Sequence, residues 1–201
     1  MRPLDLPAPG PRVGRRGNPV LRFIGRLLLR LSGWRVSGIL PNEPKLIILA
    51  APHSSLWDGV VGIAAAFALS IDAHWMGKHT LFKGWKGRLM RFVGGLPVDR
   101  SRAHGAVGEV AREFANRHTL WLAIAPEGTR KVVPRWKTGF WHIARAARVP
   151  VFQVAFHYPE KRIVIGPLFW VGRDLDTDLR RVQTFYRPWR GRGGKRAVPD
   201  A

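Results

Sequence analysis

Three largely apolar runs, separated by segments with a helical pattern, constrain the fold of this chain more than any other feature. The runs cover residues 45–51, 120–125 and 151–157. They lack regular polar alternation, which is typical of strands buried on both faces of a sheet. Helical patterns lie between them at 56–70, 103–117 and 139–147. This alternation predicts an α/β fold, a single domain with a mostly parallel central sheet flanked by helices.

Shorter signals complete the predicted architecture. We expect strands at 34–40, 73–77, 96–98 and 162–166, and a basic helical piece at 85–92. The chain divides into a disordered tail rich in Pro, Gly and Arg over 1–18, an amphipathic membrane-surface helix over 19–36, the folded domain over 37–186, and a basic flexible tail over 187–201. With 201 residues, the chain is long enough for one domain with a substantial core.

The amphipathic segment has two interpretations. One helical face carries apolar residues and another carries arginines at four-residue spacing; these are Phe23, Ile24, Leu27, Leu28 and Leu31, and Arg22, Arg26 and Arg30. Such a helix can lie in a membrane interface, with its arginines on anionic headgroups. It can equally be an ordinary helix that covers the domain core. The charge of the whole chain favours the membrane interpretation.

Charge and cysteine content narrow the function classes. The chain has 34 Lys and Arg against 13 Asp and Glu, a formal net charge of +21. Such a surface concentrates anionic partners, whether nucleic acid, anionic membrane, acidic carrier protein or phosphorylated substrate. The absence of cysteine excludes disulfides and thiolate chemistry. We find no signal peptide and no apolar stretch of the roughly 18 residues that a membrane span needs.

His53 and Asp58 form the most informative local pattern. A carboxylate held on one imidazole nitrogen fixes the tautomer and raises the basicity of the other nitrogen. Asp58 also completes a capping-box pattern with Ser55, so helix capping alone explains it. Taken alone, His53 is explained as a structural histidine at the end of a strand, with no role in catalysis. Capping would nevertheless leave His53 at the carboxyl end of its strand, where open α/β sheets bind ligands.

Two further loops contain groups suited to an anion. The run Ala-Pro-Glu-Gly-Thr-Arg at 125–130 follows a predicted buried strand and offers freed backbone donors, a hydroxyl and a guanidinium. Glu127 beside Arg130 is placed to order that arginine. The run Gly-Gly-Leu-Pro-Val-Asp-Arg at 94–100 ends in Arg100. Each loop alone is equally explained by a turn with a solvated arginine or a surface ion pair.

Taken in order, four blocks resemble the glycerolipid acyltransferase family, which includes the 1-acylglycerol-3-phosphate acyltransferases. They are the His-x4-Asp pair, the runs at 94–100 and 126–130, and the run Val-Pro-Val-Phe-Gln-Val at 149–154. The resemblance extends from about residue 45 to residue 156, more than half of the chain. Four ordered blocks are much more specific than any one of them.

The resemblance implies a role for each matching residue. His53 matches the general base that acts on the acceptor hydroxyl, and Asp58 matches the carboxylate that orients it. Arg100 matches the arginine that holds the acceptor phosphate. The block at 149–154 is linked to the acyl donor or the walls of its pocket. The block associated with acceptor binding and site organisation falls on Glu127, Gly128, Thr129 and Arg130.

The implied activity is transfer of a fatty acyl group to a lysophospholipid hydroxyl, with lysophosphatidic acid giving phosphatidic acid in phospholipid biosynthesis. An acyl thioester is already activated, so the reaction needs a base, oxyanion donors and a phosphate clamp, but no metal or other cofactor. No His-x3-His spacing supports a metal site. Without a Gly-x-Ser-x-Gly elbow, we assign Ser54 and Ser55 to capping, not to an acyl-enzyme.

The implied partners are anionic membrane lipids, the lysophospholipid acceptor, and acyl-CoA or acyl carrier protein as donor. We expect the enzyme to lie on the cytoplasmic face of a membrane, peripheral or monotopic. One alternative keeps the chemistry and changes the acceptor, for example to a lyso-ornithine lipid. Another alternative is a basic nucleic-acid-binding protein, but the chain contains no recognised DNA- or RNA-binding motif, so we expect no nucleic acid partner.

Overall fold

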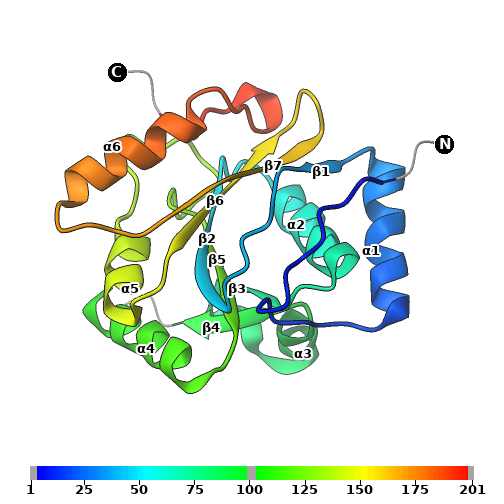
Figure 1. Ribbon diagram of the computed structural model, residues 1–201, viewed down its shortest axis with the longest axis horizontal. Helices are drawn as coiled ribbons and strands as arrows, with labels where there is room; N and C mark the ends of the chain where they lie inside the picture. The colour runs from blue at the N-terminus through cyan, green and yellow to red at the C-terminus, as the bar shows by residue number, and fades with distance from the viewer. Residues whose placement is uncertain (1–3, 99–102, 199–201) are drawn as a thin grey trace.

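The computed structural model describes residues 4–98 and 103–198, and its described part contains a seven-stranded sheet with helices on both faces (Figure 1). The strand order is β1-β7-β6-β2-β5-β3-β4, and every neighbouring pair is parallel except β6 and β7. The strands are β1 (Arg35–Ser37), β2 (Lys45–Ala51), β3 (Ala73–Lys78), β4 (Gly95–Val98), β5 (Leu120–Ile124), β6 (Val151–His157) and β7 (Arg162–Phe169). The predicted α/β fold with a mostly parallel sheet is confirmed.

Helices cover the sheet in two layers. The α-helices are α1 (Pro19–Ser32), α2 (Leu56–Leu69), α3 (Gly84–Phe92), α4 (Ala103–Asn116), α5 (Gly139–Ala147) and α6 (Leu175–Tyr186), and two short 3-10 turns are η1 (His79–Phe82) and η2 (Arg192–Gly194). Helices α1 and α2 pack side by side over one face, whereas α4, α5 and α6 lie over the other (Figure 1). Helix α3 packs against η1 and β4 at one edge.

The central strand β2 shows why the apolar runs form the middle of the sheet. Leu46 points into the core under α2, while Ile47 and Leu49 point into the core under α4 and α5, and all three side chains are fully buried. Because both faces of the strand are covered, no polar alternation is needed. The same covering applies to β5 and β6, the two strands paired with β2.

Residues 4–18, predicted to be disordered, instead lie along the folded domain. Val13 is buried in the core beside α2. Arg15 forms an antiparallel bridge with Ile71, and the Arg12 amide donates to the Asn42 side chain at 2.9 Å. Composition rich in Pro, Gly and Arg therefore does not prevent ordering here, because a few apolar contacts and backbone hydrogen bonds hold the segment.

The segment after residue 186 also differs from the predicted flexible tail. Helix α6, which the sequence reading did not include, begins with an Asp174 cap that accepts from the Thr177 amide, and it buries Val182 and Tyr186. The chain then continues to Ala197, whose carbonyl accepts from Trp136 Nε1 at 2.7 Å. Residues 187–198 are thus fastened to the domain by tertiary contacts.

Among the helices of the described residues, none is both long and apolar enough to span a bilayer.

Candidate active site

Three neighbouring parallel strands end at the same edge of the sheet, and a residue within the three positions after each strand carries a side chain of the site. Strands β6, β2 and β5 are adjacent, so the segments after them lie together. His53 follows β2, Glu127 follows β5 and Tyr158 follows β6. The carboxyl edge of a parallel sheet is where open α/β folds bind ligands, as the sequence predicts for His53.

The start of α2 fixes the position of Asp58. Ser55 is the N-cap, its hydroxyl accepts from the Trp57 amide at 3.1 Å, and the Asp58 carboxylate accepts from the Ser55 amide at 2.8 Å. The predicted capping box is confirmed. The same carboxylate oxygen, Oδ2, accepts from the Ser54 amide at 2.6 Å. Asp58 is therefore locked in place by the backbone of the loop that carries His53.

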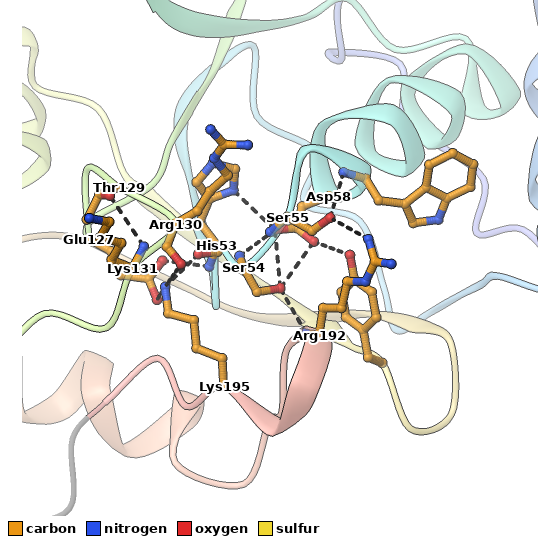
Figure 2. A network of polar contacts seen from close by, with 12 residues as sticks. His53, Ser54, Ser55, Asp58, Glu127, Thr129, Arg130, Lys131, Arg192 and Lys195 are labelled. Atoms are coloured by element: carbon orange, nitrogen blue, oxygen red, sulfur yellow. Dashed lines mark hydrogen bonds and ion pairs between the residues drawn. The ribbon is translucent and has the colours of Figure 1, made fainter.

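The predicted His53–Asp58 pair is present in the structure. His53 Nδ1 lies 3.2 Å from Asp58 Oδ2 (Figure 2). The Tyr158 hydroxyl donates to the other carboxylate oxygen, Asp58 Oδ1. Asp58 is only 1% exposed. Burial alone would raise its pKa, but hydrogen bonds from His53, Tyr158 and the Ser55 and Ser54 amides outweigh burial and hold the pKa below its ordinary value. Asp58 is thus a carboxylate at neutral pH.

An ionised Asp58 determines which imidazole nitrogen is free. The proton of neutral His53 belongs on Nδ1, facing the carboxylate, so Nε2 carries the lone pair. The His53 side chain is 31% exposed, whereas its partner is buried. The ring therefore presents a basic nitrogen outward and has a buried anion behind it. This geometry suits removal of a proton from a hydroxyl group.

Glu127 occupies a different place from the one predicted. It is 1% exposed, its Oε2 accepts from the His53 amide at 2.6 Å, and its Oε1 lies 3.3 Å from Lys195 Nζ. Among the described residues no ion pair joins Glu127 to Arg130, so the predicted pairing of these two is wrong. The Glu127 side chain thus joins the loop after β5 to the loop after β2. The two loops are close because these strands are adjacent in the sheet.

Burial raises the pKa of Glu127 from 4.5 to about 7, although the His53 amide and Lys195 oppose the shift. Between these two pH values the folded protein keeps a proton that the unfolded chain releases, so stability should fall as pH rises, by at most about 1.4 kcal/mol per pH unit. In Glu127→Gln this contribution to the pH dependence of the free energy of unfolding should disappear. Chemical denaturation between about pH 5 and about pH 7 measures it.

Glu113→Gln is the matched control, because Glu113 is a partly exposed glutamate in α4 whose ion-pair partner is Arg117 and not a histidine. Its stability profile should parallel that of the wild type. Equal slopes for wild type and Glu127→Gln would contradict the raised pKa.

Gly128, Thr129 and Arg130 are exposed around the buried Glu127. Gly128 has φ +64°, a left-handed backbone conformation that favours glycine. Lys137 and Lys131 add exposed positive charge to this loop. The loop therefore presents cations beside His53, as the sequence predicts for an anion-binding segment.

The other predicted residues are placed as follows. Arg100 lies outside the described residues. Ser54 and Ser55 hold backbone amides, since the Ser54 hydroxyl accepts from the Arg192 amide at 2.9 Å and Ser55 caps α2. The block at 149–154 enters and forms most of β6 in the buried centre of the sheet. Among the described residues, no group of three His, Cys, Asp or Glu side chains is placed to hold a metal ion.

Three residues of the site were missed by the sequence reading. Tyr158 contacts Asp58. Arg192 and Lys195 reach the His53 loop from the segment after α6 (Figure 2). Tyr158 had a usable signal, because it directly follows a strand predicted to end at the same edge. Arg192 and Lys195 had none, since they lie in a Gly- and Arg-rich stretch and make their contacts across 137 to 142 residues.

A mostly parallel α/β sheet with an outward-facing imidazole, a buried carboxylate beside it and surrounding cations is suited to removing a proton from an anionic molecule. The chain belongs to the acyltransferase family, whose model, described as "Acyltransferase", matches residues 35–157, more than half of the 201 residues. This confirms the family resemblance found in the sequence.

Individual relatives agree. The 1-acyl-sn-glycerol-3-phosphate acyltransferase of Escherichia coli is 34% identical over 99 residues, which cover 45% of this chain and 39% of that protein. The enzyme of the same name from Salmonella typhimurium is 31% identical with the same coverage. The match thus spans about two fifths of the length of these relatives.

The fold also matches a solved structure. The crystal structure of the 1-acyl-sn-glycerophosphate (LPA) acyltransferase PlsC from Thermotoga maritima gives a TM-score of 0.61 at 19% identity, covering 83% of this chain and 75% of that one. At this identity the likeness supports the fold and not a substrate.

Proposed function

We propose that this protein transfers a fatty acyl group from acyl-CoA or acyl carrier protein to the free hydroxyl of lysophosphatidic acid, forming phosphatidic acid. The observation that carries the proposal is the 3.2 Å contact between His53 Nδ1 and a buried Asp58 carboxylate within an acyltransferase family domain. The relatives that match this part of the chain are named as 1-acyl-sn-glycerol-3-phosphate acyltransferases.

In the proposed reaction, His53 Nε2 takes the proton of the acceptor hydroxyl as its oxygen attacks the thioester carbonyl carbon. Asp58 stabilises the imidazolium that forms, because it is already ionised and cannot move away. The tetrahedral intermediate then collapses and the C–S bond breaks. The imidazolium returns its proton to the departing thiolate. The thioester is already activated, so the proposed route uses neither a metal nor another cofactor.

The acceptor and donor both carry phosphate or other acidic groups, which suits the charge of this site. Exposed Arg130, Lys131 and Lys137 follow β5, and Arg192 lies beside the start of α2. The net charge of +21 would speed the arrival of anionic substrates. From the family resemblance we assign the acceptor phosphate to Arg100 together with the exposed residues Gly128, Thr129 and Arg130.

A panel of acceptors tests the proposal. Purified protein is incubated with acyl-CoA or acyl carrier protein thioester and with lysophosphatidic acid, other lysophospholipids or lyso-ornithine lipid, and products are identified by mass spectrometry. We expect phosphatidic acid as the main product. Acylation of lyso-ornithine lipid alone would contradict the phosphate acceptor. Sequence-independent DNA binding that is sensitive to salt, without binding to liposomes, would favour the nucleic-acid alternative.

We also propose that α1 holds the enzyme on an anionic membrane. Helix α1 packs on α2 through Gly25 and Leu29, its two buried residues. The apolar stripe predicted from the sequence faces away from the domain; Phe23, Ile24, Leu27, Leu28 and Leu31 are 40–73% exposed. An outward apolar stripe beside exposed arginines fits a membrane interface and not a cover for the core.

This apolar surface reaches the catalytic edge of the sheet. Helix α1 ends just before β1, which begins at the edge where β2 ends, because β1 is parallel to β7 and β7 is antiparallel to β6. Helix α2 begins at the same edge and exposes Leu56, Trp57 and Val60. A membrane seated here would bring lipid acceptors next to His53.

The double variant Phe23→Ser with Leu31→Ser should weaken binding to vesicles that contain phosphatidylglycerol by at least about tenfold, because it removes two exposed apolar side chains from the proposed interface. Co-sedimentation measures the binding. Trp170→Ser is the matched control: Trp170 is 60% exposed but follows the end of β7 at the opposite edge. Equal partitioning of the double variant and wild type would contradict attachment through α1.

A further inference from the structure

The segment that follows α6 lies against the His53 loop, and we call residues 190–197 the C-terminal strap. The Arg190 carbonyl accepts from the Tyr158 amide at 2.9 Å, and the Ala197 carbonyl accepts from Trp136 Nε1 at 2.7 Å, so both ends of the strap are fastened. Between them, Arg192 and Lys195 extend toward the loop that carries His53 (Figure 2).

Close packing of the strap requires glycine at one point. A Cβ at Gly191 would lie 2.8 Å from Ser54 Cβ and 3.1 Å from Pro52 Cγ. The Arg192 amide next to it donates to the Ser54 hydroxyl at 2.9 Å. The strap backbone is therefore in direct contact with the residue that precedes the N-cap of α2.

Lys195 makes the deepest contact of the strap. Its Nζ donates to the His53 carbonyl at 2.6 Å and to the Arg130 carbonyl at 3.2 Å, and it lies 3.3 Å from Glu127 Oε1. The Lys195 side chain is only 8% exposed and that of Glu127 only 1%. Two of the three ammonium donors are thus used by backbone carbonyls, and the contact with Glu127 is an ion pair.

The backbone of His53 is thus held from both sides. Glu127 accepts from the His53 amide at 2.6 Å, and Lys195 donates to the His53 carbonyl. Because Glu127 and Lys195 also pair with each other, the two anchors form one unit. Asp58 orients the imidazole ring, but the distance between the ring and Asp58 depends on the position of the His53 backbone.

We propose that Lys195 is a positioning residue for His53. Its ammonium group binds the His53 carbonyl and pairs with Glu127, and these contacts keep the imidazole within hydrogen-bonding distance of Asp58. The inference deepens the proposed acyl transfer and, for its kinetic consequence, rests on it. Lys195 acts through His53 and not through contact with the reacting atoms. A small displacement of a catalytic group lowers kcat more than it weakens substrate binding.

Lys195→Met tests this role, because methionine keeps much of the apolar stem and removes the ammonium. We expect kcat to fall by about ten- to 100-fold while KM for the acyl acceptor changes by less than about threefold. Lys45→Met is the matched control. Lys45 is also a partly buried lysine that donates to a backbone carbonyl, that of Phe114 at 2.7 Å, but it begins β2 at the opposite edge of the sheet. Its kcat should stay at the wild-type value.

A second measurement does not need any substrate. In protein labelled with ¹⁵N-histidine, the ring nitrogens of His53, assigned with His53→Gln, report the hydrogen bond to Asp58 and the Nδ1–H tautomer. Lys195→Met should change these shifts, and Lys45→Met should leave them in place. This result would support the positioning role even if lysophosphatidic acid proved to be the wrong acceptor.

Unchanged His53 shifts in Lys195→Met would overturn the inference, and so would an unchanged kcat. If Lys195→Met does not fold, Gly191→Ala replaces it, because the added Cβ pushes the strap away from Ser54 while the Lys195 and Glu127 side chains are both retained. That variant should lower kcat and move the His53 shifts in the same direction. Wild-type values for both would likewise overturn the proposal.

Discussion

Replacing His53 by glutamine is expected to lower kcat for acyl transfer by about 10²- to 10⁴-fold, the usual contribution of a general base. Glutamine has no group that accepts a proton near neutral pH. KM should change little, because His53 acts on the reacting hydroxyl and the proposed phosphate contacts lie elsewhere. Steady-state rates with acyl-CoA and lysophosphatidic acid measure the effect.

The fold should survive this change, since the His53 ring is 31% exposed and its backbone contacts to Glu127 and Lys195 do not involve the side chain. His118→Gln is the matched control, because His118 is exposed and precedes β5 at the opposite edge of the sheet. It should retain full activity. Wild-type rates in His53→Gln would refute the proposed mechanism.

The sequence predicted the framework of the site because the framework depends on local patterns. Strands β2, β5 and β6 are largely apolar runs. The capping box needs only Ser55 and Asp58, which lie within four consecutive residues. Given adjacent strands in a parallel sheet, the meeting of the His53 and Glu127 loops follows from topology. These parts needed no information about distant contacts.

The partners of Glu127 could not be predicted in the same way. Locally, Arg130 is the nearest cation in the sequence, and a surface ion pair was the simplest expectation. In the structure the carboxylate is buried and instead pairs with an amide 74 residues away and a lysine near the end of the chain. Burial decides between these partners, because a buried carboxylate must be satisfied from within the protein.

The strap was missed for a related reason. Glycines and arginines in the last residues are the usual composition of a mobile segment. Here Gly191 allows the strap to approach Pro52 and Ser54, and Trp136 fastens the end of the strap through a hydrogen bond to the Ala197 carbonyl. Composition describes what a segment can do alone, whereas these contacts exist only after the sheet has assembled.

Asp58→Asn is expected to lower kcat by about 10²- to 10⁴-fold as well, for a different reason. The carboxylate holds the Nδ1–H tautomer and stabilises the imidazolium, and an amide can do neither reliably because its NH2 group favours a proton on Nε2. Tyr158→Phe provides the comparison. It removes one donor to Asp58 and leaves the charge in place, so it should retain far more activity than Asp58→Asn.

Asp58→Asn should also destabilise the fold, because Asp58 accepts from the Ser54 and Ser55 amides and from Tyr158. The folded-state pKa of Asp58 lies below its ordinary value of 3.8. Its stabilising effect is therefore present above that value and is lost as the pH falls through the folded-state pKa. The stability difference between wild type and Asp58→Asn should shrink over that acidic range in chemical denaturation.

A double variant separates the catalytic effect of Asp58 from its structural effect. If Asp58 acts on the reaction only through His53, then His53→Gln combined with Asp58→Asn should have nearly the same kcat as His53→Gln alone, because groups that act as one unit are strongly non-additive. The free energy of unfolding should behave differently, because the capping contacts of Asp58 do not depend on the imidazole. The double variant should therefore show most of the loss of stability seen in Asp58→Asn. Additive losses in kcat would contradict this mechanism, because they would mean that Asp58 contributes to the reaction independently of His53.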